Sequence, residues 1–200
     1  MSKYDQEYYV IDPANSDRLP RLTPTEETVD RNYAFEVPPR GSAPFFFFNG
    51  ASDYQKKKRI DVIKDLPDVL FNGNHVIVRD RVRKELLELD ASGFELHPAV
   101  FMDDDGTWHE DFWFVCIPER FDCWDKEASD YDDDPMEIGG FELYEIEKIS
   151  LSEELLDRTP LKERLFFKLG GAQDAVLMCH QSIAGIFRSP GSKLIPVPDY

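Results

Sequence analysis

The side chains in this sequence that could catalyse a reaction or bind a metal are its histidines, cysteines and carboxylates. The histidines are His75, His97, His109 and His180, and the cysteines are Cys116, Cys123 and Cys179. A structural zinc site needs Cys or His ligands in closely spaced pairs, as in a CxxC motif. Six residues separate Cys116 from Cys123, so no zinc site is expected.

The aspartates before Gly106 look like the start of a calcium-binding loop. An EF-hand frame that uses Asp103 and Asp105 as the third and fifth ligands places Phe101 first and Phe112 twelfth. Phenylalanine cannot bind calcium. The run Asp103-Asp104-Asp105-Gly106 is therefore better explained as a tight turn.

Nucleophilic catalysis would need a base beside a nucleophile, and the only sequence hint of this is Cys179 next to His180. We expect a helix here, and neighbouring side chains on a helix do not face each other. Carboxylate pairs such as Glu110 and Asp111 arise by chance among 40 acidic residues. No GxSxG, P-loop or GxGxxG pattern occurs. We expect no catalytic, cofactor-binding or metal-binding residue.

The cellular location is predicted from the cysteines and the N-terminus. Three cysteines are an odd number, which is typical of reduced thiols. Residues 1–7 contain no apolar segment, so no signal peptide is expected. No stretch approaches the ~18 apolar residues of a membrane span. The sequence predicts a cytoplasmic protein.

The negative charge of the chain is concentrated in one segment. The 200 residues include 40 acidic and 23 basic side chains, a formal net charge of −17. From Phe101 to Glu147 there are 17 acidic residues and two basic ones, Arg120 and Lys126. A polyanion repels nucleic acids and anionic membranes and attracts basic proteins. We therefore expect a basic protein partner and no binding to nucleic acid or membrane.

This acidic segment also contains all three tryptophans, and aromatic side chains surrounded by charge are typical of protein interfaces. An exposed, solvated loop region is the alternative explanation for the charge. The candidate partner-binding residues are Asp103, Asp104, Asp105, Trp108, Glu110, Asp111, Trp124, Asp130, Tyr131, Asp132, Asp133 and Asp134.

The elements that must position these residues are predicted from periodicity and turn signals. Residues 1–60 read as a strand (4–11), a proline-rich extended arm and a buried strand at Phe45–Phe48, all packed on the same domain. Residues 79–89 have an amphipathic helical pattern. Residues 94–101 and 108–117 form a hairpin, and 141–151 alternate like a strand before a short helix capped by Ser152.

Two segments of the chain repeat one pattern. Val76-Ile77-Val78 and Val176-Leu177-Met178 each precede a predicted helix, a glycine (Gly93 or Gly191) and a strand that ends in proline. We interpret this as a β-α-β-like duplication near 66–100 and 165–198, with the acidic segment near 101–147 inserted between the copies. The prediction is an α+β domain over 61–200, with a mixed or antiparallel sheet and two amphipathic helices. A chance match between two common patterns is the alternative.

Four motifs carry a resemblance to a known family. They are Leu66-Pro67-Asp68-Val69-Leu70, the segment from Val76 to Pro98, Asp105-Gly106 before an aromatic strand, and the segment from Val176 to Val197. Over residues 60–200 the chain resembles a bacterial family first classed as a domain of unknown function and later reassigned to polymorphic-toxin immunity proteins. These motifs are structural and not catalytic.

The resemblance implies a cytosolic inhibitor that binds one cognate toxin delivered between bacteria, often by type VI secretion. The negative charge suits a basic nuclease whose cleft attracts phosphate. Two other functions stay open on the sequence alone: an adaptor or chaperone for a secretion system, and an unrecognised enzyme.

Overall fold

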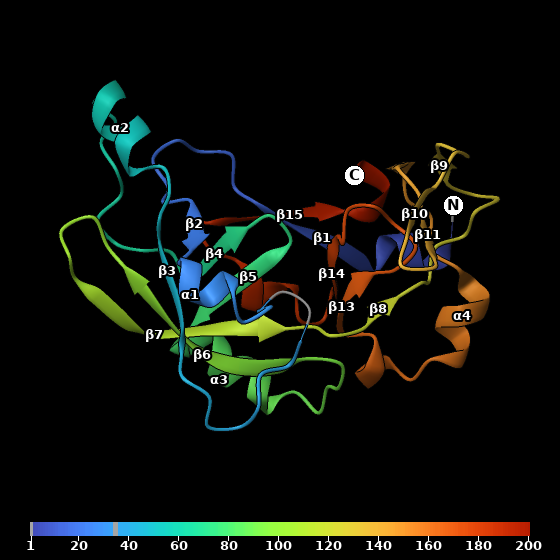
Figure 1. Cartoon of the computed structure of the whole chain (residues 1–200). Helices are drawn as coiled ribbons and strands as arrows, with labels where there is room; N and C mark the ends of the chain where they lie inside the picture. Colours follow the sequence, from blue (N-terminus) through green and yellow to red (C-terminus); the bar gives the residue numbers. More distant parts are fainter. Residues whose placement is uncertain (1, 34–35) are drawn as a thin grey trace.

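A computed structural model of the chain describes residues 2–33 and 36–200. Two mixed β-sheets lie beside each other along the long dimension of the molecule (Figure 1). The six-stranded sheet occupies the left of this view and the five-stranded sheet the right. Segments near both chain ends contact each other, since the 3-10 helix at Lys3–Gln6 packs against the one at Val197–Asp199. The fold is α+β, as predicted.

The six-stranded sheet curls until its two edge strands, β2 and β4, come into contact. β3 and β6 run parallel, and the other neighbours are antiparallel. In spatial order the strands are β2 (Leu22–Pro24), β3 (Phe45–Asn49), β6 (Glu95–Met102), β7 (Trp108–Cys116), β5 (His75–Arg79) and β4 (Val69–Asn72).

The five-stranded sheet joins strands from both ends of the chain. β8 and β13 run parallel, and the other neighbours are antiparallel. In spatial order the strands are β15 (Ser192–Pro196), β1 (Tyr8–Pro13), β14 (Leu177–His180), β13 (Phe166–Leu169) and β8 (Arg120–Phe121).

Short ribbons and helices complete the fold. The ribbons pair β9 (Asp130–Tyr131) with β12 (Ile146–Lys148) and β10 (Met136–Ile138) with β11 (Phe141–Leu143). The α-helices are α1 (Glu26–Val29), α2 (Ser52–Lys58), α3 (Asp80–Glu88) and α4 (Glu153–Arg158). The 3-10 helices are η1 (Lys3–Gln6), η2 (Leu161–Glu163), η3 (Ala184–Phe187) and η4 (Val197–Asp199).

Alternating side chains on the strands divide the apolar residues into separate cores. On β5, Val76 and Val78 face a core shared by the two sheets, whereas Ile77 faces the inside of the curled sheet. The shared core also receives Leu177 from β14 and Val82 from α3. Each of these buried side chains contributes about 1.5–3 kcal/mol through removal of apolar surface from water. The shared core therefore fixes the position of one sheet against the other.

The proline-rich arm adds its own structure to the six-stranded sheet. It contains β2 and α1, which the sequence did not predict. Thr25 caps α1 by accepting a hydrogen bond from the Thr28 amide. Tyr33 is buried edge-on against Phe45, Phe47 and Phe114. The arm thus covers the aromatic core inside the curled sheet.

Several predicted elements are observed close to their expected bounds. The hairpin is β6 and β7, the first amphipathic helix is α3, and Ser152 caps α4 through the Leu155 amide. The strand predicted at 141–151 is divided into β11 and β12. The strand predicted at 4–11 begins only at Tyr8, because residues before it form η1.

The prediction of a second amphipathic helix within residues 172–188 is wrong. Leu177–His180 form β14, and only Ala184–Phe187 are helical, as the 3-10 turn η3. β14 pairs with β1 on one side and β13 on the other, and all four of its residues are buried. A short apolar run buried on both faces has no period that separates strand from helix.

The two repeated segments share a strand arrangement despite this difference. β5 and β6 are parallel and flank the antiparallel β7. β14 and β15 are likewise parallel and flank the antiparallel β1. Helix α3 joins the first pair and η3 the second. Common origin of the two segments stays a prediction.

Gly191, directly before β15, packs tightly against the backbone at the start of β4, and this yields a test. A Cβ atom on Gly191 would lie 2.2 Å from the Val69 carbonyl oxygen and 2.9 Å from Pro67 Cβ. We expect Gly191→Ala to lower the free energy of unfolding by about 1–3 kcal/mol, because backbone must move to admit the methyl group. Urea denaturation measures this change.

Gly185→Ala is the matched control, since a Cβ atom there would have no heavy atom within 4 Å. This variant should be as stable as the wild type or slightly more stable. Equal destabilisation of both variants would contradict close packing at Gly191.

Candidate functional site

The predicted partner-binding residues do not lie on one continuous surface. The turn between β6 and β7 is at the left end of the molecule in Figure 1, whereas β9, β10 and β11 are at the right end. The strands of both sheets lie between them. The acidic segment of the sequence therefore forms two separate acidic regions.

At the left end, the acidic side chains mainly shape the β6–β7 turn. Asp103 accepts a hydrogen bond from the Asp104 amide at 2.7 Å, and Asp105 accepts one from the Thr107 amide at 2.8 Å. Asn49 donates to Asp104 at 3.2 Å. The turn explanation for this aspartate run agrees with these contacts. Trp108 stands beside the turn and is 57% exposed.

Glu110 and Asp111 follow on β7 and are exposed. Asp111 forms an ion pair with Arg79 at 3.3 Å. The Arg79 guanidinium also stacks over Phe112, 5.2 Å from the ring centroid. Asp111 is thus partly neutralised by its own chain, and no acid–base pair with Glu110 is formed.

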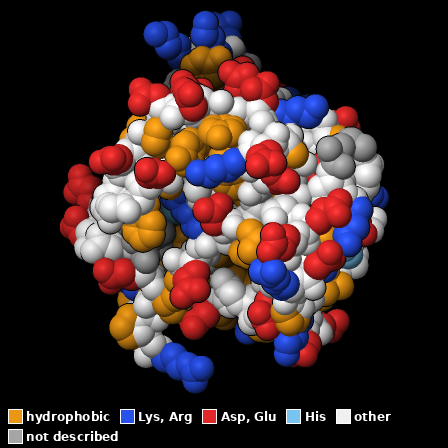
Figure 2. All heavy atoms as spheres, turned by 90° about the vertical axis from the view of Figure 1, so that its right-hand side faces the viewer, with side chains coloured by type: hydrophobic (Ala, Val, Ile, Leu, Met, Phe, Trp, Pro, Cys, Tyr) orange, Lys and Arg blue, Asp and Glu red, His pale blue; other side chains and the backbone are white. Residues whose placement is uncertain are grey.

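At the right end, residues 122–148 form a second region, which we call the acidic end. Its acidic side chains are Asp122, Asp125, Glu127, Asp130, Asp132, Asp133, Asp134, Glu137, Glu142, Glu145 and Glu147. Between Asp122 and Glu147 the only basic residue is Lys126. Figure 2 faces this end of the molecule and shows acidic side chains spread among exposed hydrophobic ones.

Long-range contacts hold the acidic end on the five-stranded sheet. The buried carboxylate of Asp5 accepts hydrogen bonds from the Leu151 amide at 2.8 Å and the Ser150 hydroxyl at 3.0 Å. The Tyr144 amide donates to the Gly171 carbonyl at 2.8 Å. These bonds connect the acidic end to the N-terminal segment and to the turn after β13, so that its loops have a fixed base.

The β10–β11 hairpin presents apolar side chains to solvent within this acidic surface. Met136 is 49% exposed, Ile138 52% and Phe141 72%. The strands pair only with each other among the described residues, and Gly139 and Gly140 form the turn with positive φ angles. These three residues are not among the predicted partner-binding residues, although a Gly-Gly pair between apolar residues is a hairpin signal.

Trp124 is buried beneath this surface. It is 5% exposed and packs edge-on against Tyr131 and Tyr144, with ring centroids 5.0 and 5.7 Å away. Tyr131 and Tyr144 are 5.3 Å apart. The interpretation of Trp124 as a direct contact residue needs correction, because a buried ring supports the surface from below. Lys126 lies above it, 4.0 Å from the Tyr144 ring centroid.

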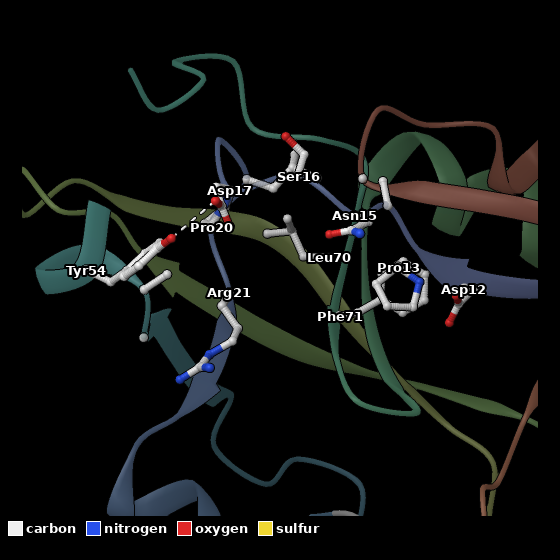
Figure 3. A pocket seen from close by; sticks show the side chains of 15 residues that line it. Asp12, Pro13, Asn15, Ser16, Asp17, Pro20, Arg21, Tyr54, Leu70 and Phe71 are labelled. Atoms are coloured by element: carbon white, nitrogen blue, oxygen red, sulfur yellow. Dashed lines mark hydrogen bonds between the residues drawn. The ribbon is translucent and has the colours of Figure 1, made fainter. Parts of the chain in front are cut away.

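A separate groove lies where the edges of the six-stranded sheet meet (Figure 3). Its volume is about 710 Å³, and it lies between residues 12–21, α2 and β4. Tyr54 donates a hydrogen bond to Asp17 across it at 3.3 Å, and Leu70 and Phe71 line its wall (Figure 3). The described residues contain no group of His, Cys, Asp or Glu side chains placed to hold a metal ion.

The comparison with protein families gives one match, to the Imm11 immunity protein family, over residues 7–178. The match spans most of the chain. The chain belongs to the Imm11 immunity protein family. A comparison with curated proteins finds none that matches. Within residues 2–33 and 36–200, no helix is long and apolar enough to cross a membrane.

Membership of Imm11 indicates an immunity function against a toxin. The family also confirms the resemblance found in the sequence.

The Cys179–His180 pair has no catalytic arrangement in this Imm11 protein. Cys179 is buried in the shared core, where burial raises the pKa of its thiol to about 12. His180 points to the other side of β14, and its Nδ1 atom accepts from the Ser182 amide and lies 2.8 Å from the Ser182 hydroxyl. Glu7 lies 3.5 Å from Nε2. The Ser182 amide and hydroxyl thus both contact His180 Nδ1, as in a local side chain–backbone turn.

Among the described residues, the basic side chains with the largest pKa shifts are Lys168 and His75. Their contact joins the two sheets. The Lys168 ammonium lies 3.2 Å from His75 Nδ1. Burial lowers the pKa of Lys168 to about 8 and that of His75 to about 4. The cavity beside Lys168 has a volume of about 10 Å³, room for about one water molecule. The pair is a structural contact without space for a substrate.

The buried lysine predicts a pH dependence of stability. Its folded-state pKa of about 8 is below its ordinary value of 10.5. Between these pH values the unfolded chain binds more protons, so the free energy of unfolding rises with pH. We expect Lys168→Met to remove a rise on the order of 3 kcal/mol between about pH 8 and 10.5. Urea denaturation at a series of pH values measures it.

Lys84→Met, at an exposed position of α3, serves as the control. This variant should keep the wild-type pH dependence, because its side chain is in water in both states. If the Lys168→Met and wild-type curves stay parallel across this range, the ammonium of Lys168 is not destabilised by burial.

Proposed function

We propose that this Imm11 protein neutralises a basic toxin, a nuclease domain, by direct contact through its acidic end. One observation carries the proposal: the β10–β11 hairpin places three exposed apolar side chains inside a surface with eleven carboxylates and two lysines, Lys126 and Lys148. Apolar anchors surrounded by charge provide both affinity and orientation in protein complexes.

The carboxylates favour a nuclease because an enzyme that cleaves nucleic acid attracts phosphates with basic side chains. A protein surface with a high density of carboxylates offers similar charges to the same cleft. Long-range attraction would steer the two proteins together, and the steering would weaken with salt. A plug in the active site is the simplest arrangement that uses this complementarity.

The contact also needs an attraction that persists in salt. Met136, Ile138 and Phe141 supply it, because the burial of apolar surface is not screened by salt. A two-stranded ribbon is marginally stable alone, and a partner strand could pair with either of its free edges. The hairpin thus combines apolar anchors with available backbone groups.

The first experiment is purification of the tagged protein from its native lysate with a high-salt wash. The expected result is one stoichiometric partner with a basic C-terminal domain, as for a toxin delivered by type VI or another contact-dependent machinery. That domain, expressed in a test bacterium, should stop growth, and this Imm11 protein should restore it. A set of weak partners without toxicity would favour a secretion adaptor.

The aspartate run Asp132–Asp134 should control the rate of association. The triple variant Asp132→Asn, Asp133→Asn and Asp134→Asn keeps the side-chain shape, including the Asp132 acceptor for the Asp134 amide. We expect association with the captured toxin to slow about tenfold at low salt and to depend less on salt. Stopped-flow measurements at several ionic strengths test this.

The charge-matched control is Glu26→Gln, Glu27→Gln and Asp30→Asn on α1, far from the acidic end (Figure 1). It removes the same formal charge and should change association only slightly. If both triple variants slow association equally, overall charge steers the toxin and the acidic end is not its docking surface.

Phe141 should act mainly on the dissociation rate. Its side chain is 72% exposed, so Phe141→Ser should leave the thermal midpoint nearly unchanged. Loss of an aromatic anchor should raise the dissociation rate ten- to a hundredfold, about 1.5–3 kcal/mol of binding free energy. Leu87→Ser, at a 58% exposed position of α3, is the control. Unchanged dissociation of the Phe141 variant would exclude the hairpin as an anchor.

A further inference from the structure

The Tyr144 ring at the acidic end holds a cation supplied by the protein itself. The Lys126 ammonium lies 4.0 Å from the centroid of Tyr144 and 5.6 Å from that of Trp124. Tyr131 and Trp124 pack edge-on against Tyr144 and fix the orientation of its ring. Tyr144 donates a hydrogen bond to Glu142 at 2.7 Å, which places a carboxylate beside the ring. This arrangement is a cation-binding site that is occupied internally.

Lys126 is a weakly held occupant of this site. Its side chain is exposed, and the described residues give it no ion pair within 4.0 Å. An exposed cation–π contact of a flexible lysine corresponds to about a two- to fivefold change in an equilibrium constant. A competing cation that also bonded to a carboxylate could replace it.

We propose that an arginine side chain of the toxin displaces Lys126 from the Tyr144 ring when the complex forms. An arginine fits this position better than a lysine, since its planar guanidinium can stack on the ring while its N–H groups bond to the Glu142 carboxylate. The surrounding carboxylates attract such a side chain, and Lys126 moves to solvent. This inference rests on the proposed function and specifies how the acidic end recognises its partner.

If an arginine of the toxin displaces Lys126, removal of the Lys126 ammonium should strengthen toxin binding. Lys126→Gln frees the ring and should lower the dissociation constant of the toxin complex about two- to fivefold more than Lys148→Gln does. Lys148 is exposed at the same end of the molecule, on β12, so the two variants change the charge equally. In a Tyr144→Leu background the advantage of Lys126→Gln over Lys148→Gln should disappear.

If Lys126→Gln and Lys148→Gln change the dissociation constant of the toxin complex equally, the displacement proposal fails. It also fails if Lys126→Gln weakens binding. Either result would leave the proposed function intact if the Asp132–Asp134 and Phe141 variants still reduce binding. Thermal denaturation of each variant establishes that the fold is retained.

A second measurement uses no toxin. The side-chain CH₂ protons of Lys126 should be shielded by the Tyr144 ring in the NMR spectrum. Addition of an acetylated hexa-arginine peptide should return them to unshielded positions, at a lower concentration than hexa-lysine requires. If hexa-arginine shifts the Asp132–Asp134 amides while Lys126 stays shielded, arginine does not displace Lys126. If hexa-lysine is equally effective, the ring does not select arginine, which also overturns the proposal.

Discussion

The shared apolar core between the two sheets is the constraint on which the rest of the molecule depends. Val78 from β5 and Leu177 from β14 are buried in it, together with Val82 from α3. Neither sheet could expose these faces to water without a large free-energy cost. Once the two sheets pack, the β6–β7 turn and the acidic end are held at opposite ends of the molecule (Figure 1).

The two acidic regions have different structural surroundings. In the β6–β7 turn the aspartate carboxylates accept hydrogen bonds from nearby backbone amides, and these bonds explain the geometry of the turn. At the acidic end the carboxylates surround exposed apolar side chains and have two lysines among them, Lys126 and Lys148. Charge of the same sign thus stabilises a turn in one place and surrounds exposed apolar side chains in the other.

Buried polar contacts connect the acidic end to the core. Asp5 binds the backbone after β12, and Tyr144 binds the turn after β13, so the surface loops rest on elements far away in the sequence. Trp124 fills the space beneath them. A rigid base of this kind reduces the entropy lost when a surface binds its partner. The Imm11 family function, inhibition of a toxin, is consistent with a surface prepared in this way.

The sequence by itself determined the features that depend on local pattern and composition. The concentration of negative charge, the β6–β7 hairpin, α3 and the Ser152 cap follow from residue type, periodicity and turn chemistry. The family resemblance also came from local motifs, and the comparison with families confirmed it. These properties need no knowledge of how distant segments pair.

Only the tertiary structure decided which acidic residues share a surface and which aromatic side chains are exposed. Trp124 is buried because Leu151 and Gly171, both distant in sequence, pack against it. Residues 177–180 are a strand because β1 and β13 supply hydrogen bonds on both sides. Pairing between distant strands is set by the whole chain, since each backbone group bonds to the partner that packing brings near.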